Sequence, residues 1–143
     1  MQKNNINKIY KKYLSVSEDN CKKWSKDFFT NFFCNKNVFF FSSKIESGGY
    51  LIARKIFDEF EVLSLATNRK ERRKGIASEL LRSLFKKAEQ EKAKKILLEV
   101  SKKNIPAIKM YEKFGFNIEG NRKNYYKTPS GLKDAYIMIK SIS

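Results

Sequence analysis

Three cations crowd the start of a predicted helix in the stretch RRKGIASELL, residues 72–81. The N-terminus of a helix is the positive end of the helix dipole, so Arg72, Arg73 and Lys74 are unfavourable there unless an anion binds. Free backbone N–H groups and Gly75 would let a ligand approach the backbone closely. The stretch therefore predicts an anion site of the strand–loop–helix type, suited to a pyrophosphate. The alternative is a basic helix start that occurs by chance.

Several other kinds of site find little support in this chain of 143 residues. Histidine is absent, and Cys21 and Cys34 have neither metal nor redox spacing, so we expect no metal site. The sequence has neither a Walker loop nor a GxGxxG pattern. No apolar run of roughly 18 residues and no secretion signal occurs, so we expect a cytoplasmic protein with no membrane segment.

The formal net charge of +16 leaves two interpretations open. Such a charge favours anionic partners, including nucleic acid, the ribosome and phosphorylated cofactors. Most of the excess is lysine spread along the chain beside many asparagines and isoleucines, a bias that an AT-rich genome also produces. The charge is therefore either functional or compositional, and the function that we infer below does not require nucleic-acid binding.

The hydrophobic pattern predicts a single α/β domain over residues 1–143, with one mixed sheet flanked by helices. The expected helices are 6–14, 24–34, 74–91 and 105–115, and the expected strands are 38–45, 49–57, 60–67, 96–100, 115–120 and 134–141. Asp58 and Glu59 are placed in a hairpin turn, and Asn104 is the expected N-cap of the last helix. A meander followed by strand–helix–strand requires a crossover in the middle of the sheet.

Several stretches resemble the GNAT acetyltransferases. The R-x-x-G-x-A pattern that begins at Arg72 resembles the loop with which this family binds the pyrophosphate of acetyl-CoA. LEVSKKNIPAIKMYEKFGF (98–116) is similar to the family's strand, N-x-x-A-I-x-x-Y helix and GF segment. RKNYYKTPSGLKDAYIMIK (122–140) and WSKDFF (24–29) resemble segments of the RimI-type ribosomal-protein alanine N-acetyltransferases. The resemblance implies one GNAT domain, with the good match over about 60–140.

The resemblance implies that acetyl-CoA is the cosubstrate and that its acetyl group passes directly to an amine, with no acyl-enzyme. The pantetheine arm would lie in a splay between parallel strands 60–67 and 96–100. A backbone N–H near Ala66 or Thr67 is the candidate donor to the acetyl oxygen. The implied cofactor-binding residues are Leu65, Ala66, Thr67, Arg72, Arg73, Lys74, Gly75, Ile76, Ala77, Ser78 and Asn104.

Two residues match the family's acid–base pair. Glu99 matches the catalytic glutamate, which would take a proton from the amine directly or through a water. Tyr111 matches the proton donor to the departing thiolate. Without the resemblance, Glu99 would be interpreted as a salt-bridged carboxylate and Tyr111 as a packing aromatic. Trp24, Tyr125 and Tyr126 are candidates for the substrate entrance, and the alternative for the two tyrosines is strand or loop packing.

The attacking amine must be neutral, which favours a protein N-terminus as the substrate. An α-amine has a pKa of about 8, so roughly 10% is neutral at pH 7, against roughly 0.04% of lysine side chains. The resemblance implies the N-terminal alanine of a small-subunit ribosomal protein. Two alternatives stay open: a GNAT enzyme for lysine side chains or small amines, which a closed acidic pocket would indicate, and a non-catalytic module that binds RNA or the ribosome.

Overall fold

The computed structural model describes residues 3–16, 23–71, 74–128 and 131–142, with side chains for 5–16, 23–71, 74–122 and 134–142. In this part of the chain, six strands form one sheet in the order β1-β2-β3-β4-β6-β5. The strands are β1 (Val38–Ser42), β2 (Gly49–Ile56), β3 (Glu59–Thr67), β4 (Lys95–Ser101), β5 (Asn117–Thr128) and β6 (Gly131–Ser141). The helices are α1 (Lys3–Val16), α2 (Lys26–Phe33), α3 (Ile76–Gln90) and α4 (Ile105–Lys113), with a 3-10 turn η1 (Arg69–Glu71).

The predicted mixed sheet and its central crossover are confirmed. β1, β2 and β3 form an antiparallel meander, and β3 pairs with β4 in parallel. Two parallel neighbours need a crossover connection, which α3 supplies here. β4 then pairs antiparallel with β6, and β5 forms the outer strand against β6. The last two strands are therefore not in chain order across the sheet.

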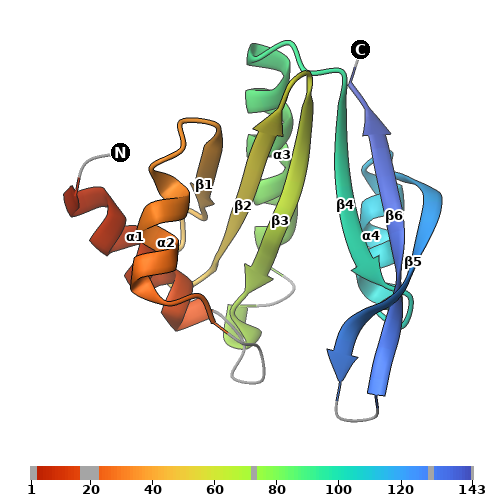
Figure 1. The fold of residues 1–143 in the computed structure, drawn as a ribbon, viewed down its shortest axis with the longest axis horizontal. Helices are drawn as coiled ribbons and strands as arrows, with labels where there is room; N and C mark the ends of the chain where they lie inside the picture. The colour runs from red at the N-terminus through yellow and green to blue at the C-terminus, as the bar shows by residue number, and fades with distance from the viewer. Residues whose placement is uncertain (1–2, 17–22, 72–73, 129–130, 143) are drawn as a thin grey trace.

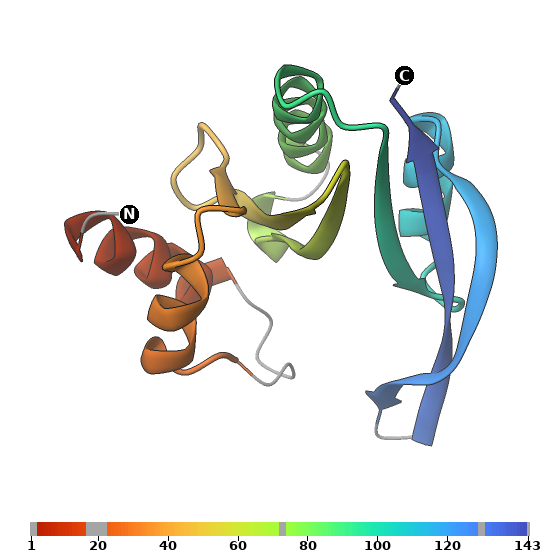
Figure 2. The ribbon, with the colours of Figure 1, turned by 45° about the horizontal axis from the view of Figure 1, so that its top comes forward.

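The helices cover the two faces of the sheet unequally (Figures 1 and 2). α1 and α2 pack on one face of the meander, in an aromatic-rich core that includes Tyr50 and Ile52 of β2. α3 and α4 pack on the other face, in a core that includes Leu51 and Ala53. Because successive strand residues point to opposite faces, these two cores lie on opposite sides of β2. Among the described helices, none lies over the front of β4, β6 and β5 in Figure 1.

A buried lysine joins α1 to the edge of the sheet. Lys12 is 5% exposed, and its Nζ donates to the Ser42 hydroxyl at 2.5 Å and to the Ser43 carbonyl at 3.2 Å. Burial is the main cause that lowers the pKa of Lys12. The three N–H donors of the ammonium therefore orient the first helix over β1.

In the described residues, no helix has the length and apolar character needed to cross a membrane.

Several predicted strand boundaries were wrong, and the first strand, for example, ends at Ser42 instead of residue 45. The turn between β2 and β3 contains Phe57 and Asp58, because Ile56 pairs with Glu59, whereas the sequence pattern placed Asp58 and Glu59 there. Phe57 has a φ of 55°, a conformation that a bulky residue rarely adopts. The residue type therefore did not predict a turn at Phe57. The final hairpin is also longer than predicted, since β5 continues to residue 128 and β6 begins at residue 131.

Candidate active site

The parallel strands β3 and β4 separate after a short ladder. Only residues 59–61 of β3 pair with residues 95–97 of β4 in the described structure. The register of β2 against β3 shifts between Ile52 and Ala53, which leaves Leu63 as an extra residue. Such a bulge bends the strand that contains it. Beyond the bulge, the edge of β3 that faces β4 has no ladder to that strand, which is the splay that the family resemblance implied.

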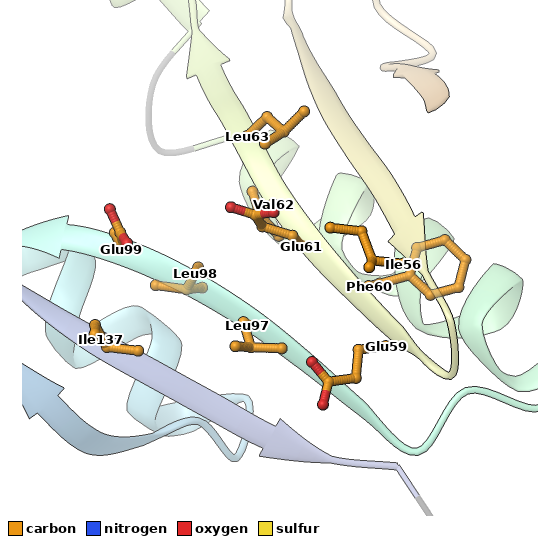
Figure 3. A pocket seen from close by; sticks show the side chains of 10 residues that line it. All are labelled: Ile56, Glu59, Phe60, Glu61, Val62, Leu63, Leu97, Leu98, Glu99 and Ile137. Atoms are coloured by element: carbon orange, nitrogen blue, oxygen red, sulfur yellow. The ribbon is translucent and has the colours of Figure 1, made fainter. Parts of the chain in front are cut away.

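A cavity of about 320 Å³ lies in this gap (Figure 3). Its size is near the lower end of the range of about 300–1,000 Å³ that small-molecule sites occupy. Figure 3 shows Glu99 on β4 facing the gap, with Val62 and Leu63 on β3 across it. The lining residues are Ile56, Glu59, Phe60, Glu61, Val62, Leu63, Leu97, Leu98, Glu99 and Ile137. The cavity is therefore mainly apolar, with three carboxylates in its wall.

Each of these three carboxylates pairs with a cation on another strand. The closest nitrogen–oxygen distances are 3.2 Å for Glu59–Lys95, 2.9 Å for Glu61–Arg54 and 3.0 Å for Glu99–Arg122. Because each negative charge has its own counter-charge, the wall is not the closed acidic pocket that a small cationic amine would select. The charges at the cavity therefore do not favour the small-amine alternative.

Glu99 is on the face of β4 that no described helix covers. Its neighbours Leu98 and Val100 face the core under α3 and α4, so alternation places Glu99 on the opposite side. The Nη1 atom of Arg122 donates to both carboxylate oxygens of Glu99, at 3.0 and 3.2 Å. Sequence reasoning missed Arg122, although it opens the RKNYY segment, because its partner depends on the strand order.

Tyr111 lies on the other face of the sheet from Glu99, in the core under α3 and α4. It is 8% exposed and belongs to the core under α3 and α4, where its ring meets the Phe116 ring edge-on at 5.7 Å between centroids. The ten residues that line the cavity include Glu99 and do not include Tyr111. The two predicted catalytic residues thus belong to opposite faces of β4, on either side of the splay.

The predicted anion loop is described in part. Arg72 and Arg73 lie outside the described residues, and Lys74 pairs with Glu71 at 2.7 Å. The hydrogen bond from Lys74 is the main cause that lowers the pKa of Glu71. Gly75 has a φ of 75° and contributes no side-chain cap to α3, and a Cβ there would meet no atom within 4 Å. No atom therefore crowds the backbone at Gly75, directly before the first amides of α3, which are those of Ile76 to Ser78.

The first turn of α4 is capped by the side chain of Asn104. The Asn104 side chain accepts a hydrogen bond from the Ala107 amide at 3.3 Å, which confirms the predicted N-cap. The Asn104 side-chain NH₂ group is a donor, and its predicted contact with the cofactor arm stays a prediction. Leu65, Ala66 and Thr67 are half-buried residues on the part of β3 that lies beyond the ladder.

The three predicted substrate contacts have different surroundings. Trp24 is half-buried beside α2, where its ring contacts Tyr13, Phe28, Phe29 and Phe32. Its backbone N–H donates to the Tyr13 hydroxyl at 2.8 Å, so this aromatic cluster also fixes the entry to α2. The backbones of Tyr125 and Tyr126 lie in β5, and their side chains are outside the described residues.

Known proteins match both the sequence and the fold. Residues 4–116 match the sequence model of the Acetyltransferase (GNAT) family. A ribosomal protein bS18-alanine N-acetyltransferase of Escherichia coli strain K12 is 35% identical over 94 residues, which cover 66% of this chain and 64% of that protein. A protein of the same name from Salmonella typhimurium is 32% identical over 124 residues, which cover 84% of this chain and 82% of that protein.

A solved structure extends this similarity to the whole described fold. The crystal structure of the ribosomal-protein-S18-alanine N-acetyltransferase from Escherichia coli superposes with a TM-score of 0.82 and 26% identity. The superposition covers all of this chain and 91% of that one. The sequence alignment with the Escherichia coli protein, in contrast, spans slightly less than two thirds of its length.

Proposed function

We propose, from the premise that this chain belongs to the acetyltransferase (GNAT) family, that it transfers the acetyl group of acetyl-CoA to the α-amine of a protein N-terminus. The resemblance seen in the sequence is confirmed at the level of family and fold. The observation that carries the proposal is the position of Glu99, in the wall of the cavity between the splayed strands β3 and β4.

The splay and the start of α3 fit acetyl-CoA. The edge of β3 from Leu65 to Thr67 offers backbone groups to an extended arm, since β4 does not pair with it. The amides from Ile76 to Ser78 and the loop cations would bind the pyrophosphate, and Gly75 leaves the approach open. When bound, acetyl-CoA supplies an acetyl group activated as a thioester.

The acid–base chemistry is assigned to Glu99 and Tyr111. Glu99 takes a proton from the substrate ammonium and leaves a neutral amine that can attack the acetyl carbon. The Tyr111 hydroxyl gives a proton to the departing sulfur. A backbone N–H of Ala66 or Thr67 donates to the acetyl oxygen as negative charge develops on it. The role of Glu99 is supported by its place in the cavity wall, whereas Tyr111 does not line this cavity and its role rests on the family resemblance.

The substrate that we propose is the N-terminal alanine of ribosomal protein bS18 or a protein with a similar N-terminus. The names of the two bacterial relatives support this choice. The face of β4, β6 and β5 beside Glu99 is free of described helices, which favours an extended peptide over a small enclosed amine (Figure 1). Trp24, Tyr125 and Tyr126 stay the candidate residues for peptide contact.

Acetyl-CoA consumption with a peptide panel tests the proposal. Half of the peptides begin with free alanine, serine or methionine, and half have a blocked N-terminus and an internal lysine. We expect turnover on the free N-termini alone. Glu99→Gln and Tyr111→Phe should each lower kcat by roughly a hundredfold or more, because each removes a proton-transfer group.

Glu112→Gln is the matched control for these variants. Glu112 is an exposed carboxylate on α4, next in sequence to Tyr111, and its substitution should leave kcat unchanged. Turnover on blocked lysine peptides would move the substrate class to side-chain amines. Acetyl-CoA binding with no turnover on either half, together with salt-sensitive RNA binding, would favour the non-catalytic alternative.

A further inference from the structure

We propose that Arg122 is a positioning residue for Glu99, which holds the carboxylate at the cavity wall in the orientation needed to accept a proton. The proposal rests on the acetyl transfer proposed above and deepens it. Arg122 lies beyond residues 4–116, the segment that matches the family model. The assignment therefore comes from the contacts of this chain.

The Glu99–Arg122 pair differs in geometry from the other two pairs at the cavity. Arg54 and Glu61 are directly opposite on adjacent strands, and so are Glu59 and Lys95. Such cross-strand pairs are an ordinary feature of sheets. Arg122, in contrast, is on β5 and reaches over β6 to Glu99 on β4. Simple pairing of neighbouring strands therefore does not account for this contact.

Small residues leave a path for the long arginine side chain. In the register, Glu99 is opposite Ile137, and Ile137 is opposite Gly120, so β5 has no side chain in that row. Arg122 is in the next row, opposite Ala135, which carries only a methyl group. Arg122 can thus lean across β6 toward Glu99, and the sequence of both strands fits this crossing.

The exposure of the two side chains indicates that this contact stabilises the fold only weakly. The Glu99 side chain is 23% exposed, whereas the Arg122 side chain is 56% exposed. A pair in which one partner is so exposed contributes little to folding stability. Nevertheless, one charged nitrogen that donates to both oxygens favours a particular orientation of the carboxylate. A small displacement of a catalytic group can cost much of the rate, so turnover should report this role.

The test compares Arg122→Ala and Arg122→Lys with the wild type on the free-alanine peptide. We expect Arg122→Ala to lower kcat roughly tenfold, with the KM values of peptide and acetyl-CoA changed less than about twofold. Arg122→Lys should retain part of the lost rate, because it keeps the charge without the planar fork. Added guanidinium ion should restore part of the turnover of Arg122→Ala. The melting temperature of Arg122→Ala should match that of the wild type.

Arg82→Ala is the control for the loss of one positive charge. Arg82 is exposed on α3, where it lies over the Phe114 ring, and we expect its substitution to leave kcat unchanged. If Arg122→Ala turns over as fast as an active wild type, the role of Arg122 is overturned and the proposed function is not. The role of Arg122 would also be overturned if Arg122→Ala lost rate, had a lower melting temperature and was not rescued by guanidinium. The loss of rate would then be a structural effect. Absent wild-type turnover on every N-terminal peptide would overturn the proposed function and this role with it.

Discussion

The helices α3 and α4 each follow one strand of the splayed pair, but their first turns differ. α3 follows Gly75, which has a φ of 75° and no side chain to satisfy the first amides. α4 follows Asn104, whose side chain accepts a hydrogen bond from the Ala107 amide. Unsatisfied amides and the dipole make a helix N-terminus attractive to anions, and a side-chain cap removes part of that attraction. The difference agrees with the pyrophosphate site proposed at the start of α3, whereas the Asn104 side chain keeps its NH₂ group as a candidate donor to the cofactor arm.

The largest effect expected from this comparison is at Gly75. Asn and Asp both tolerate a positive φ, so Gly75→Asn and Gly75→Asp differ mainly by one negative charge. We expect Gly75→Asp to bind acetyl-CoA roughly tenfold or more weakly than Gly75→Asn, because its carboxylate would repel the pyrophosphate. Calorimetric titration at low and high salt measures this ratio, which salt should reduce. Equal affinities of the two variants for acetyl-CoA would contradict the placement of the pyrophosphate at the start of α3.

An intermediate effect is expected at Asn104. Asn104→Ala should cost about 1 kcal/mol of folding stability through the lost cap, or a few degrees in melting temperature. Asn104→Asp keeps the acceptor for the Ala107 amide and should melt no lower than the wild type. Both variants lose the side-chain NH₂ group, so a raised KM for acetyl-CoA in both would show that this group contacts the cofactor. A normal KM in Asn104→Asp would leave Asn104 as a cap alone.

The smallest effect is expected at Lys74, beside the start of α3. The Lys74 hydrogen bond lowers the pKa of Glu71 below its ordinary value of 4.5, so the pair stabilises the fold above that pH. This stabilisation is lost as the pH falls through the lowered pKa of Glu71. Lys74→Met should therefore melt slightly below the wild type near neutral pH and level with it at strongly acidic pH. Paired melting scans across this range check it, and a difference that persists in acid would implicate a contact other than Glu71.

Much of the fold could be predicted because its elements have strong local signals. The periodicity of α3 and the Asn104–Gly115 boundaries of α4 gave helices that the structure confirms. The splay was predicted as well, but only through the family resemblance, since a bulge at Leu63 has no mark in the local pattern. The turn at Phe57 was misplaced because its positive φ contradicts the preference of a bulky residue.

Features that depend on strand order could not be predicted from the residues. Arg122 is 23 residues from Glu99 in sequence, and the two meet only because β6 inserts between β4 and β5. The burial of Lys12 was also missed, since a lysine on a helix is ordinarily exposed and its partners lie 30 residues away. In both cases the tertiary arrangement supplies the partner that the local sequence lacks.

The short ladder between β3 and β4 should be visible in hydrogen exchange. Past Glu61, amides of β3 alternate between those that donate to β2 and those that point into the gap. In deuterated water, the gap-facing amides should exchange faster than their neighbours, because no strand protects them. A ligand arm laid along this edge would slow those amides and leave the alternate ones unchanged. The pattern of protection along Val62–Thr67 would then report, residue by residue, how far the arm extends.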